Sequence, residues 1–282
     1  MGDAEKLKIT NLDPGELERL VDAQNEIFAD YIIPVTSSPQ FLREFMRSIG
    51  GKAENVLIAA DGEDIIGYVN PVIDDKEVWI GGLGVVPAFR RRGVGRRLMI
   101  AAEDFARDRG AEESILEVIE GNLPALALYE RLGYSAKGRK YLSAEGRAVQ
   151  FAGFGLMPSR VRFDDVLDLH RTVYCDACWQ RRKVSALTES ERTCETYSVD
   201  GGFVMLRRVG TTGHIPFIGV LPEKRGLGIG TSLTKFALSR LWELGAFKVA
   251  IYNVNDDRPT RRMLDKFDFA VTLKQIEMRK AI

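Results

Sequence analysis

A repeat at a constant offset of 135 residues is the feature that most constrains the fold of this chain. The same residue types recur, with no insertion between them, at positions of special geometry. The first copy has Gly84, Val85, Pro87, Arg90, Gly93, Gly95, Leu98, Ala102, Gly110, Ala111 and Pro124; the second has Gly219, Val220, Pro222, Arg225, Gly228, Gly230, Leu233, Ala237, Gly245, Ala246 and Pro259. Self-similarity at a fixed offset indicates two copies of one structural unit. We therefore expect two domains, residues 1–152 and 153–282.

The composition is that of ordinary globular domains. Of 282 residues, 45% are hydrophobic and 28% are charged, so the chain can bury a sizeable core and is not a disordered chain. Its 40 basic and 40 acidic side chains give a formal charge of zero, so no nucleic-acid partner is expected. Three cysteines, an odd number, do not predict a disulfide framework.

The start of the chain and its hydropathy predict neither a leader peptide nor a membrane partner. The sequence MGDAEKLKIT is charged and lacks the apolar run of a signal peptide. No stretch of about 18 apolar residues, the length that spans a bilayer, occurs anywhere. A cytoplasmic location is the expectation that follows.

Local patterns predict alternating helices and strands in the first copy. Asp13 and Ser38 each precede a proline, which suits the first turn of a helix. Asp61-Gly62, between two apolar runs, predicts a hairpin of residues 56–60 and 65–69. The other expected elements are strands at 78–86 and 114–119, a helix from the glycine-rich turn to Arg109, and a short helix capped by Asn122.

The second copy is predicted to follow the same plan. A helix is expected at 165–174, and Gly245 ends another that begins near 228. Strands are expected at 203–208, 214–220 and 248–253. This order of elements places both copies in the α/β class, with Trp79 and Trp242 expected in the cores.

Two glycine-rich turns, residues 90–95 and 225–230, each follow a strand and open a helix. Glycines let the backbone approach a ligand and present several N–H groups to it, and the helix dipole adds positive potential. A tight turn alone is the other interpretation, but the duplication favours an anion site suited to a pyrophosphate. The spacing fits neither the Rossmann fingerprint nor a Walker loop.

Both copies contain V-x-P-x-x-R-x-x-G-x-G-x-x-L, which resembles the acyl-CoA-binding motif of the GNAT superfamily of N-acyltransferases. The stretch LEVIEGNLPALALYERLGY, residues 116–134, resembles the second signature of ribosomal-protein and other protein N-terminal acetyltransferases in that superfamily. The resemblance covers about residues 8–142 and 160–282, and is weaker in the second copy after its glycine turn. The tandem arrangement is similar in architecture to the mycothiol synthase family.

The resemblance implies two tandem GNAT folds, each a mixed sheet flanked by helices and splayed beside the strand before the glycine turn. It implies acetyl-CoA as co-substrate, with the pantetheine arm in the splay and the pyrophosphate on the turn. The implied CoA-binding residues are Leu83, Val85, Arg90, Arg91, Arg92, Gly93, Val94, Gly95, Arg96 and Asn122 in the first copy, and Val220, Arg225, Gly226, Gly228, Gly230 and Thr231 in the second.

The resemblance also implies catalytic residues in the first copy. Glu117 matches the base of the N-terminal acetyltransferases, and Tyr129 matches the tyrosine that protonates the departing CoA thiolate. The alternatives are a Glu117 that pairs with an arginine or caps a helix, and a Tyr129 that is a core aromatic. The implied reaction moves acetyl to a primary amine on a small molecule, a peptide or a protein.

The second copy lacks this set, because the offset turns Glu117 into Tyr252 and Tyr129 into Leu264. His214 lies six residues before Val220, on the same strand face, and is either a base or a hydrogen-bonded surface histidine. The second copy is therefore a degenerate domain, a CoA sensor or a second active site. A protein that binds acyl-CoA without turnover is the alternative for the whole chain.

A metal site is not expected. Cys175, Cys178, Cys194 and His170 supply only one clear ligand pair, whereas a structural zinc site usually has two.

Overall fold

The computed structural model describes residues 7–33 and 35–282; the charged start of the chain, residues 1–6, lies outside them. The chain forms two compact units. Unit 1 comprises residues 1–138 and 277–282, and unit 2 comprises residues 139–276. The structural units do not coincide with the sequence repeats, because each unit contains a segment from the other half of the chain.

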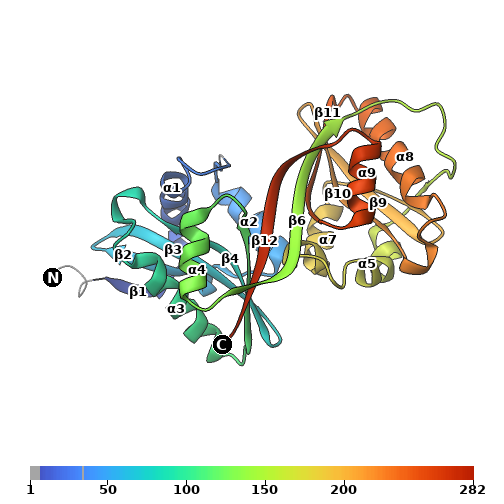
Figure 1. Ribbon diagram of the computed structural model, residues 1–282. Coiled ribbons are helices and arrows are strands. Elements are labelled where there is room, and N and C mark those ends of the chain that lie inside the picture. Colours follow the sequence, from blue (N-terminus) through green and yellow to red (C-terminus); the bar gives the residue numbers. More distant parts are fainter. Residues whose placement is uncertain (1–6, 34) are drawn as a thin grey trace. The chain divides into compact units, whose positions relative to one another are not determined.

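Unit 1 is a mixed α/β unit built on one sheet with the strand order β1-β2-β3-β4-β5-β12 (Figure 1). Its last strand comes from the end of the chain, since residues 277–282 belong to this unit. Its elements are β1 Lys8–Asn11, α1 Leu17–Ile27, α2 Pro39–Ile49, β2 Leu57–Asp61, β3 Asp64–Asp74, β4 Glu77–Val85, α3 Val94–Arg107, β5 Glu113–Ile119, α4 Leu123–Arg131 and the end of β12 Ala270–Ala281.

Unit 2 repeats this plan in the order β6-β11-β10-β9-β8-β7. Here β6 is the strand that begins in the first half of the sequence, and it pairs antiparallel with β11 from Tyr141 to Arg147. The elements are β6 Ser135–Arg147, β7 Ser159–Arg160, α5 Leu167–Val173, α6 Trp179–Arg182, α7 Val184–Glu191, β8 Glu195–Val199, β9 Gly202–Val209, β10 Thr212–Val220, α8 Ile229–Glu243, β11 Lys248–Asn255 and α9 Arg258–Lys266.

The predicted helix starts of the first copy are confirmed by their caps. The side chains of Asp13, Ser38 and Asn122 accept hydrogen bonds from the backbone N–H groups of the following turns. The Asp13 cap opens a short 3-10 turn, which α1 continues from Leu17.

The hairpin of β2 and β3 is confirmed, but its turn is one residue later than predicted. Asp61 is the last residue of β2 and faces Asp64 in β3. Gly62 and Glu63 therefore form the turn, and Gly62 has φ 61°. A glycine at the first turn position suits the type II′ geometry that joins twisted strands.

Helices α1 and α3 cover opposite faces of the unit 1 sheet. A Cβ on Gly67 would meet Leu98 of α3, whereas a Cβ on Gly84 would meet Ile27 of α1 at 2.4 Å. Gly84 pairs with Tyr68, the neighbour of Gly67, and neighbouring strand residues face opposite sides. The bare backbone at Gly84 thus lets the end of α1 lie directly on β4, beside the glycine turn.

The expected splay is present in both units. Strands β4 and β5 pair in parallel only from Glu77 to Trp79, although β4 continues to Val85. In unit 2, β10 and β11 pair only from Thr212 to His214, although β10 continues to Val220. The backbone edge of each strand before the glycine turn is therefore open to a partner other than the neighbouring strand.

One core prediction is wrong. Trp79 is buried as expected, but Trp242 is 46% exposed. Its neighbour Leu241 is fully buried and takes the core-facing position in α8, so Trp242 lies on the outer side of the helix.

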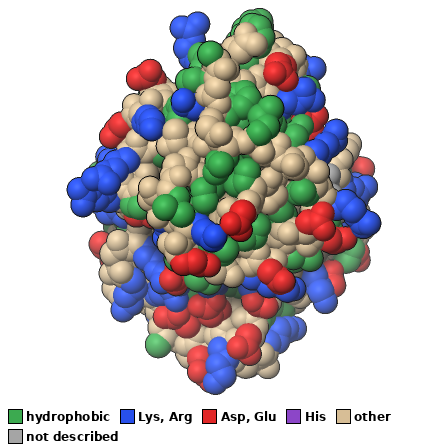
Figure 2. Space-filling view, turned by 90° about the vertical axis from the view of Figure 1, so that its right-hand side faces the viewer, with side chains coloured by type: hydrophobic (Ala, Val, Ile, Leu, Met, Phe, Trp, Pro, Cys, Tyr) green, Lys and Arg blue, Asp and Glu red, His purple; other side chains and the backbone are tan. Residues whose placement is uncertain are grey.

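Charges of both signs are interspersed on the molecular face of Figure 2, without a field of one sign over it. This agrees with the zero formal charge of the chain.

Candidate active site

A cavity of about 730 Å³ lies in unit 1 between the end of α1, the open part of β4, the glycine turn and the start of α4. Leu83 and Val85 of β4 line it, and so do the predicted turn residues Arg90, Arg91, Gly93, Val94, Gly95 and Arg96. Asn122 lines the same cavity from the cap of α4. The structure therefore brings nine of the ten first-copy CoA residues together; Arg92 does not line the cavity, and its guanidinium lies 5.3 Å from the Phe89 ring centre.

The glycine turn holds backbone conformations that explain its residues. Gly93, which precedes α3, has φ 83°, in the left-handed region that favours glycine. Arg91 also has a left-handed φ, 65°, which costs about 1–2 kcal/mol for a residue with a Cβ. The matching residue of the second copy is Gly226, with φ 85°. An arginine kept at a strained position of a cavity wall is consistent with a role for its charge.

Among the described residues, no atom lies close enough to require a glycine at position 95. A Cβ there would meet only Leu128 at 3.5 Å and Val85 at 3.7 Å, both ordinary contacts. A glycine inside a helix costs roughly 0.5–1 kcal/mol relative to alanine. Since Gly95 faces the cavity, its missing side chain leaves room for whatever occupies the cavity.

The cavity favours an anion at the glycine turn. No side chain caps the N-terminus of α3, so the N–H groups of Val94, Gly95 and Arg96 lack partners within the helix. The charged lining residues are four arginines and one aspartate, namely Arg90, Arg91, Arg96, Arg131 and Asp30. The helix N-terminus and the excess of arginine both stabilise negative charge.

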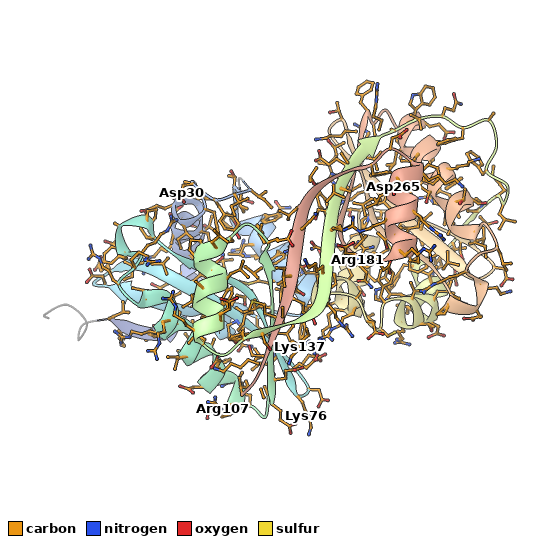
Figure 3. The ribbon with its side chains drawn as sticks, in the orientation of Figure 1. Asp30, Lys76, Arg107, Lys137, Arg181 and Asp265 are labelled. Carbon is orange, nitrogen blue, oxygen red and sulfur yellow. The ribbon has the colours of Figure 1, made fainter. Side chains whose placement is uncertain are left out.

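Arg90 braces the turn from within. Its guanidinium donates to both oxygens of Asp30, at 2.6 and 2.8 Å, and to the backbone oxygens of Ile27 and Val85. Asp30, labelled in Figure 3, has a lowered pKa because of the hydrogen bonds and charge of Arg90. Arg90 thus ties the glycine turn to the end of α1, and most of its donors are already used.

Tyr31 and Asn122 meet at the other side of the cavity. The Asn122 amide donates to the Tyr31 hydroxyl at 3.4 Å, while its carbonyl caps α4. Burial raises the pKa of Tyr31. A single asparagine therefore positions the start of α4 and a hydroxyl of the loop after α1.

Tyr129 lies in α4 and is 8% exposed. It does not line the cavity directly, but it interacts electrostatically with Tyr31, which does. Burial, with a smaller contribution from Tyr31, raises the pKa of Tyr129 well above its usual value. Its hydroxyl therefore stays protonated throughout the neutral range.

Glu117 lies on β5 and does not line the cavity either. Its carboxylate accepts a hydrogen bond of 2.5 Å from the indole Nε1 of Trp79 on β4. Trp79 is 2% exposed, so its ring is fixed by packing and holds the carboxylate in one orientation. This contact joins the last paired residue of β4 to the part of β5 beyond the pairing.

The second glycine turn repeats the geometry of the first. Gly226 and Gly228 have φ values of 85° and 83°, and a Cβ on Gly230 would meet only Val220, at 3.7 Å. Arg225 donates to the backbone oxygen of Val220, as Arg90 does to Val85. Thr231 is the counterpart of Arg96, and it accepts a hydrogen bond from Lys266.

In unit 2, His214 and Tyr252 take the places of Trp79 and Glu117. Both pairs are related by the repeat offset, and the two rings lie 5.9 Å apart. Burial, with the charge of Arg207, lowers the pKa of His214. Tyr252 is 48% exposed.

Sequence reasoning missed three groups at the first site: Asp30, Arg131 and the hydroxyl of Tyr68. Asp30 pairs with an arginine 60 positions away, and no local pattern announces such a pair. Burial raises the pKa of Tyr68, and its hydroxyl interacts electrostatically with both Tyr31 and Tyr129.

In the group formed by Cys175, Cys178, Cys194 and His170, the histidine is a packed core residue. His170 is fully buried, its Nε2 bonds to the backbone oxygen of Arg181, and its ring stacks on Tyr174. Over residues 7–33 and 35–282, no three His, Cys, Asp or Glu side chains are grouped so that they could hold a metal ion. In the same residues, no helix has the length and apolar character needed to cross a bilayer.

A family model described as Acetyltransferase (GNAT) family matches residues 19–134 and 177–269. The chain is 38% identical over 95 residues to streptothricin acetyltransferase of Streptomyces lavendulae, a match that covers 33% of this chain and half of that protein. It is 27% identical over 274 residues to mycothiol acetyltransferase of Mycobacteroides abscessus, covering 87% and 89% of the two chains.

Among solved structures, the tandem GNAT protein from the clavulanic acid biosynthesis pathway superposes with a TM-score of 0.69 at 17% identity. The superposition covers 98% of each chain. A likeness at this identity concerns the fold, and it extends over both halves of the sequence.

Proposed function

Because the chain belongs to the GNAT family of acetyltransferases, we propose that unit 1 transfers the acetyl group of acetyl-CoA to a primary amine by direct attack in a ternary complex. The observation that carries this proposal is the cavity of unit 1. One side presents bare backbone, free N–H groups and arginines, while the other presents the Tyr31 hydroxyl and the Asn122 amide.

In the proposed complex, the pyrophosphate lies on the N–H groups of Val94, Gly95 and Arg96, with Arg91 supplying charge. The pantetheine arm pairs with the open edge of β4 at Leu83 and Val85, where β5 has turned away. A backbone N–H of this edge donates to the thioester oxygen and stabilises the oxyanion that forms there.

The reaction forms one bond and breaks one. The amine nitrogen attacks the thioester carbon, the C–N bond forms, and the C–S bond then breaks to release CoA. The nitrogen loses a proton and the sulfur gains one. We assign the first proton to Glu117 through a water molecule, and the second to Tyr129.

Glu117 matters most for an amine that is protonated in solution. Freeing the lone pair of a lysine-type amine at neutral pH costs roughly 4 kcal/mol, against about 1 kcal/mol for an α-amine. The Trp79 indole orients the carboxylate through its hydrogen bond.

Tyr129 acts on the leaving group. Its raised pKa makes a full proton transfer to a free thiolate unfavourable, so its main contribution is a hydrogen bond to the sulfur while negative charge develops there. The proton crosses within this hydrogen bond as the C–S bond breaks, and the tyrosinate regains a proton from solvent after CoA leaves.

The acceptor is proposed as an amine on a small molecule or on a peptide or protein terminus. Its side of the cavity is formed by Phe28, Tyr31 and Ile32, and the adjacent Ile33 is partly exposed. Two relatives have the small molecules streptothricin and mycothiol in their names. Small-molecule amines therefore come first in the screen, followed by peptides.

The test is an assay of CoA release with a panel of amines. For the best amine, Tyr129→Phe is expected to lower kcat by about 10²-fold or more, and Glu117→Gln by a similar factor at neutral pH. The matched control is His214→Ala, which changes the corresponding place in unit 2 and is expected to leave the rate unchanged. Loss of activity in His214→Ala with full activity in both unit 1 variants would move the chemistry to unit 2.

A further inference from the structure

We infer that the splay of unit 2 is filled by the chain's own side chains, Tyr174 and Arg181, so that only unit 1 admits an acyl-pantetheine arm. This inference deepens the proposed function and rests on it for the comparison with unit 1. It decides among the roles open to the second copy, because a unit with a closed slot is neither a second acetylation site nor a second acetyl-CoA carrier.

The two units have a matching pair of aromatic rings beside the splay, but the hydroxyl is on a different ring: on Tyr68 in unit 1 and on Tyr174 in unit 2. The Phe28 and Tyr68 rings of unit 1 lie edge to face with centres 6.3 Å apart, and the Tyr174 and Phe203 rings of unit 2 do the same at 6.3 Å. Tyr174 is thus the counterpart of Phe28. In unit 1 this position has a ring without a hydroxyl and lines the cavity.

The Tyr174 hydroxyl occupies the backbone edge that corresponds to the open edge of β4. It donates to the Ile218 oxygen at 2.8 Å and accepts from the Ile218 N–H at 2.9 Å. Ile218 is the repeat partner of Leu83, and each pairs with a matching residue of its neighbouring strand. The two Ile218 groups that a pantetheine arm would bind already have partners.

Arg181 closes the rest of the gap. Its guanidinium donates to the Tyr252 backbone oxygen on β11 at 2.7 Å and to the Tyr174 hydroxyl at 3.0 Å. Through Tyr174 it therefore connects β11 to β10 beyond the point where their pairing stops. Figure 3 labels Arg181 among the side chains of unit 2.

Arg181 is held in a fixed, buried position. It is 5% exposed, its guanidinium carbon lies 5.1 Å and 5.3 Å from the ring centres of Tyr174 and Phe217, and among the described residues no carboxylate forms an ion pair with it. A buried cation without an acidic partner is costly, and the two rings and two hydrogen bonds offset part of that cost. Arg181 therefore fills the gap between β10 and β11 permanently and does not move aside for a ligand.

The direct test is hydrogen exchange of single amides in the full chain, measured by NMR. The Ile218 amide is expected to be protected in the wild type, to be unaffected by saturating acetyl-CoA, and to exchange about tenfold faster in Tyr174→Phe, which removes its partner. Tyr68→Phe is the control, because it removes a buried hydroxyl of unit 1. Equal Ile218 exchange in wild type and Tyr174→Phe, or new protection of Ile218 on adding acetyl-CoA, would overturn the inference.

The Leu83 amide separates this inference from the proposed function. If acetyl-CoA leaves the Leu83 amide unchanged, the proposed function fails, while the Tyr174→Phe comparison still decides whether unit 2 is closed.

Calorimetry gives an independent result. We expect one acetyl-CoA per chain, with binding lost in Gly95→Val and retained in the matched Gly230→Val. Phe28→Tyr, which places the hydroxyl of unit 2 in unit 1, is expected to weaken binding about tenfold. Two acetyl-CoA molecules per chain, or a single site lost in Gly230→Val, would contradict the closure.

Discussion

At the scale of single residues, several side chains of both units have a backbone geometry or a pKa that is displaced from the ordinary. Arg91 has a left-handed backbone, Tyr129 is buried beside Tyr31, and His170 is enclosed by aromatic rings. Each of these features has a stability cost that a substitution can reveal.

Arg91→Gly is expected to stabilise the protein by about 0.5–1 kcal/mol while weakening acetyl-CoA binding. Glycine adopts φ 65° without strain, but it removes a cation from the cavity. Thermal unfolding and calorimetric titration measure the two effects. Arg92→Gly is the control: Arg92 has no positive φ and does not line the cavity, so it should lose stability and keep its affinity.

Acid is expected to destabilise the protein through His170. Burial lowers the pKa of His170 to about 4 from 6.5, with smaller contributions from neighbouring arginines. Above pH 6.5 the ring is neutral in both states. Between pH 6.5 and 4 only the unfolded chain binds the proton. The free energy of unfolding therefore decreases by up to about 3 kcal/mol as the pH is lowered through this range. Urea unfolding at pH 7 and pH 5 should show a smaller loss in His170→Gln, which cannot titrate.

At the scale of elements, the contacts between helices and strands decide where the site residues lie. The end of α1 rests on the bare backbone of Gly84, and Arg90 ties the glycine turn to the same end. The loop carrying Tyr31 begins there, so the packing of one helix fixes the side of the cavity that we propose for the acceptor.

Gly84→Ala is therefore expected to cost about 2–3 kcal/mol of stability and to weaken acetyl-CoA binding, since its Cβ would lie 2.4 Å from Ile27. Gly219→Ala in unit 2 meets Val173 at 2.7 Å and should cost similar stability without changing acetyl-CoA affinity. Unchanged affinity in Gly84→Ala would show that α1 does not position the cavity wall.

The elements that could be predicted were those with local signals. Asp13, Ser38 and Asn122 cap helices through bonds to residues two or three positions away, and the glycine turns repeat in sequence and in φ. The contact between Asp30 and Arg90 could not be predicted, because it depends on how α1 packs. The plug of Tyr174 in unit 2 depends on a tertiary hydrogen bond to a backbone 44 residues away.

At the scale of the whole molecule, the sheets exchange strands between the two halves of the sequence. Residues 277–282 belong to unit 1, where Arg279 bonds to Glu77, Glu113 and the buried Glu277. A repeat at a fixed offset cannot show such an exchange, since either pairing of the equivalent strands satisfies the same sequence pattern.

Arg279→Ala is expected to destabilise unit 1 by about 3–5 kcal/mol, because it leaves a buried carboxylate and two partly buried ones without their cation. Exchange of the β5 amides should rise, and acetyl-CoA binding should weaken, although residue 279 lies in the second half of the sequence. Arg262→Ala, an exposed arginine of α9, is the control and should change neither.

The exchange of strands also sets the order in which the protein can be completed during synthesis. The edge of β5 has no final partner until residues 277–281 have been made, about 140 residues after unit 1 otherwise ends. At 5–20 residues per second this interval is roughly 7–28 s on the ribosome. For that time the first-made half exposes a strand edge of the kind that templates aggregation. Of the two units, the one that we propose to be catalytic is therefore synthesised first, but its sheet is completed last.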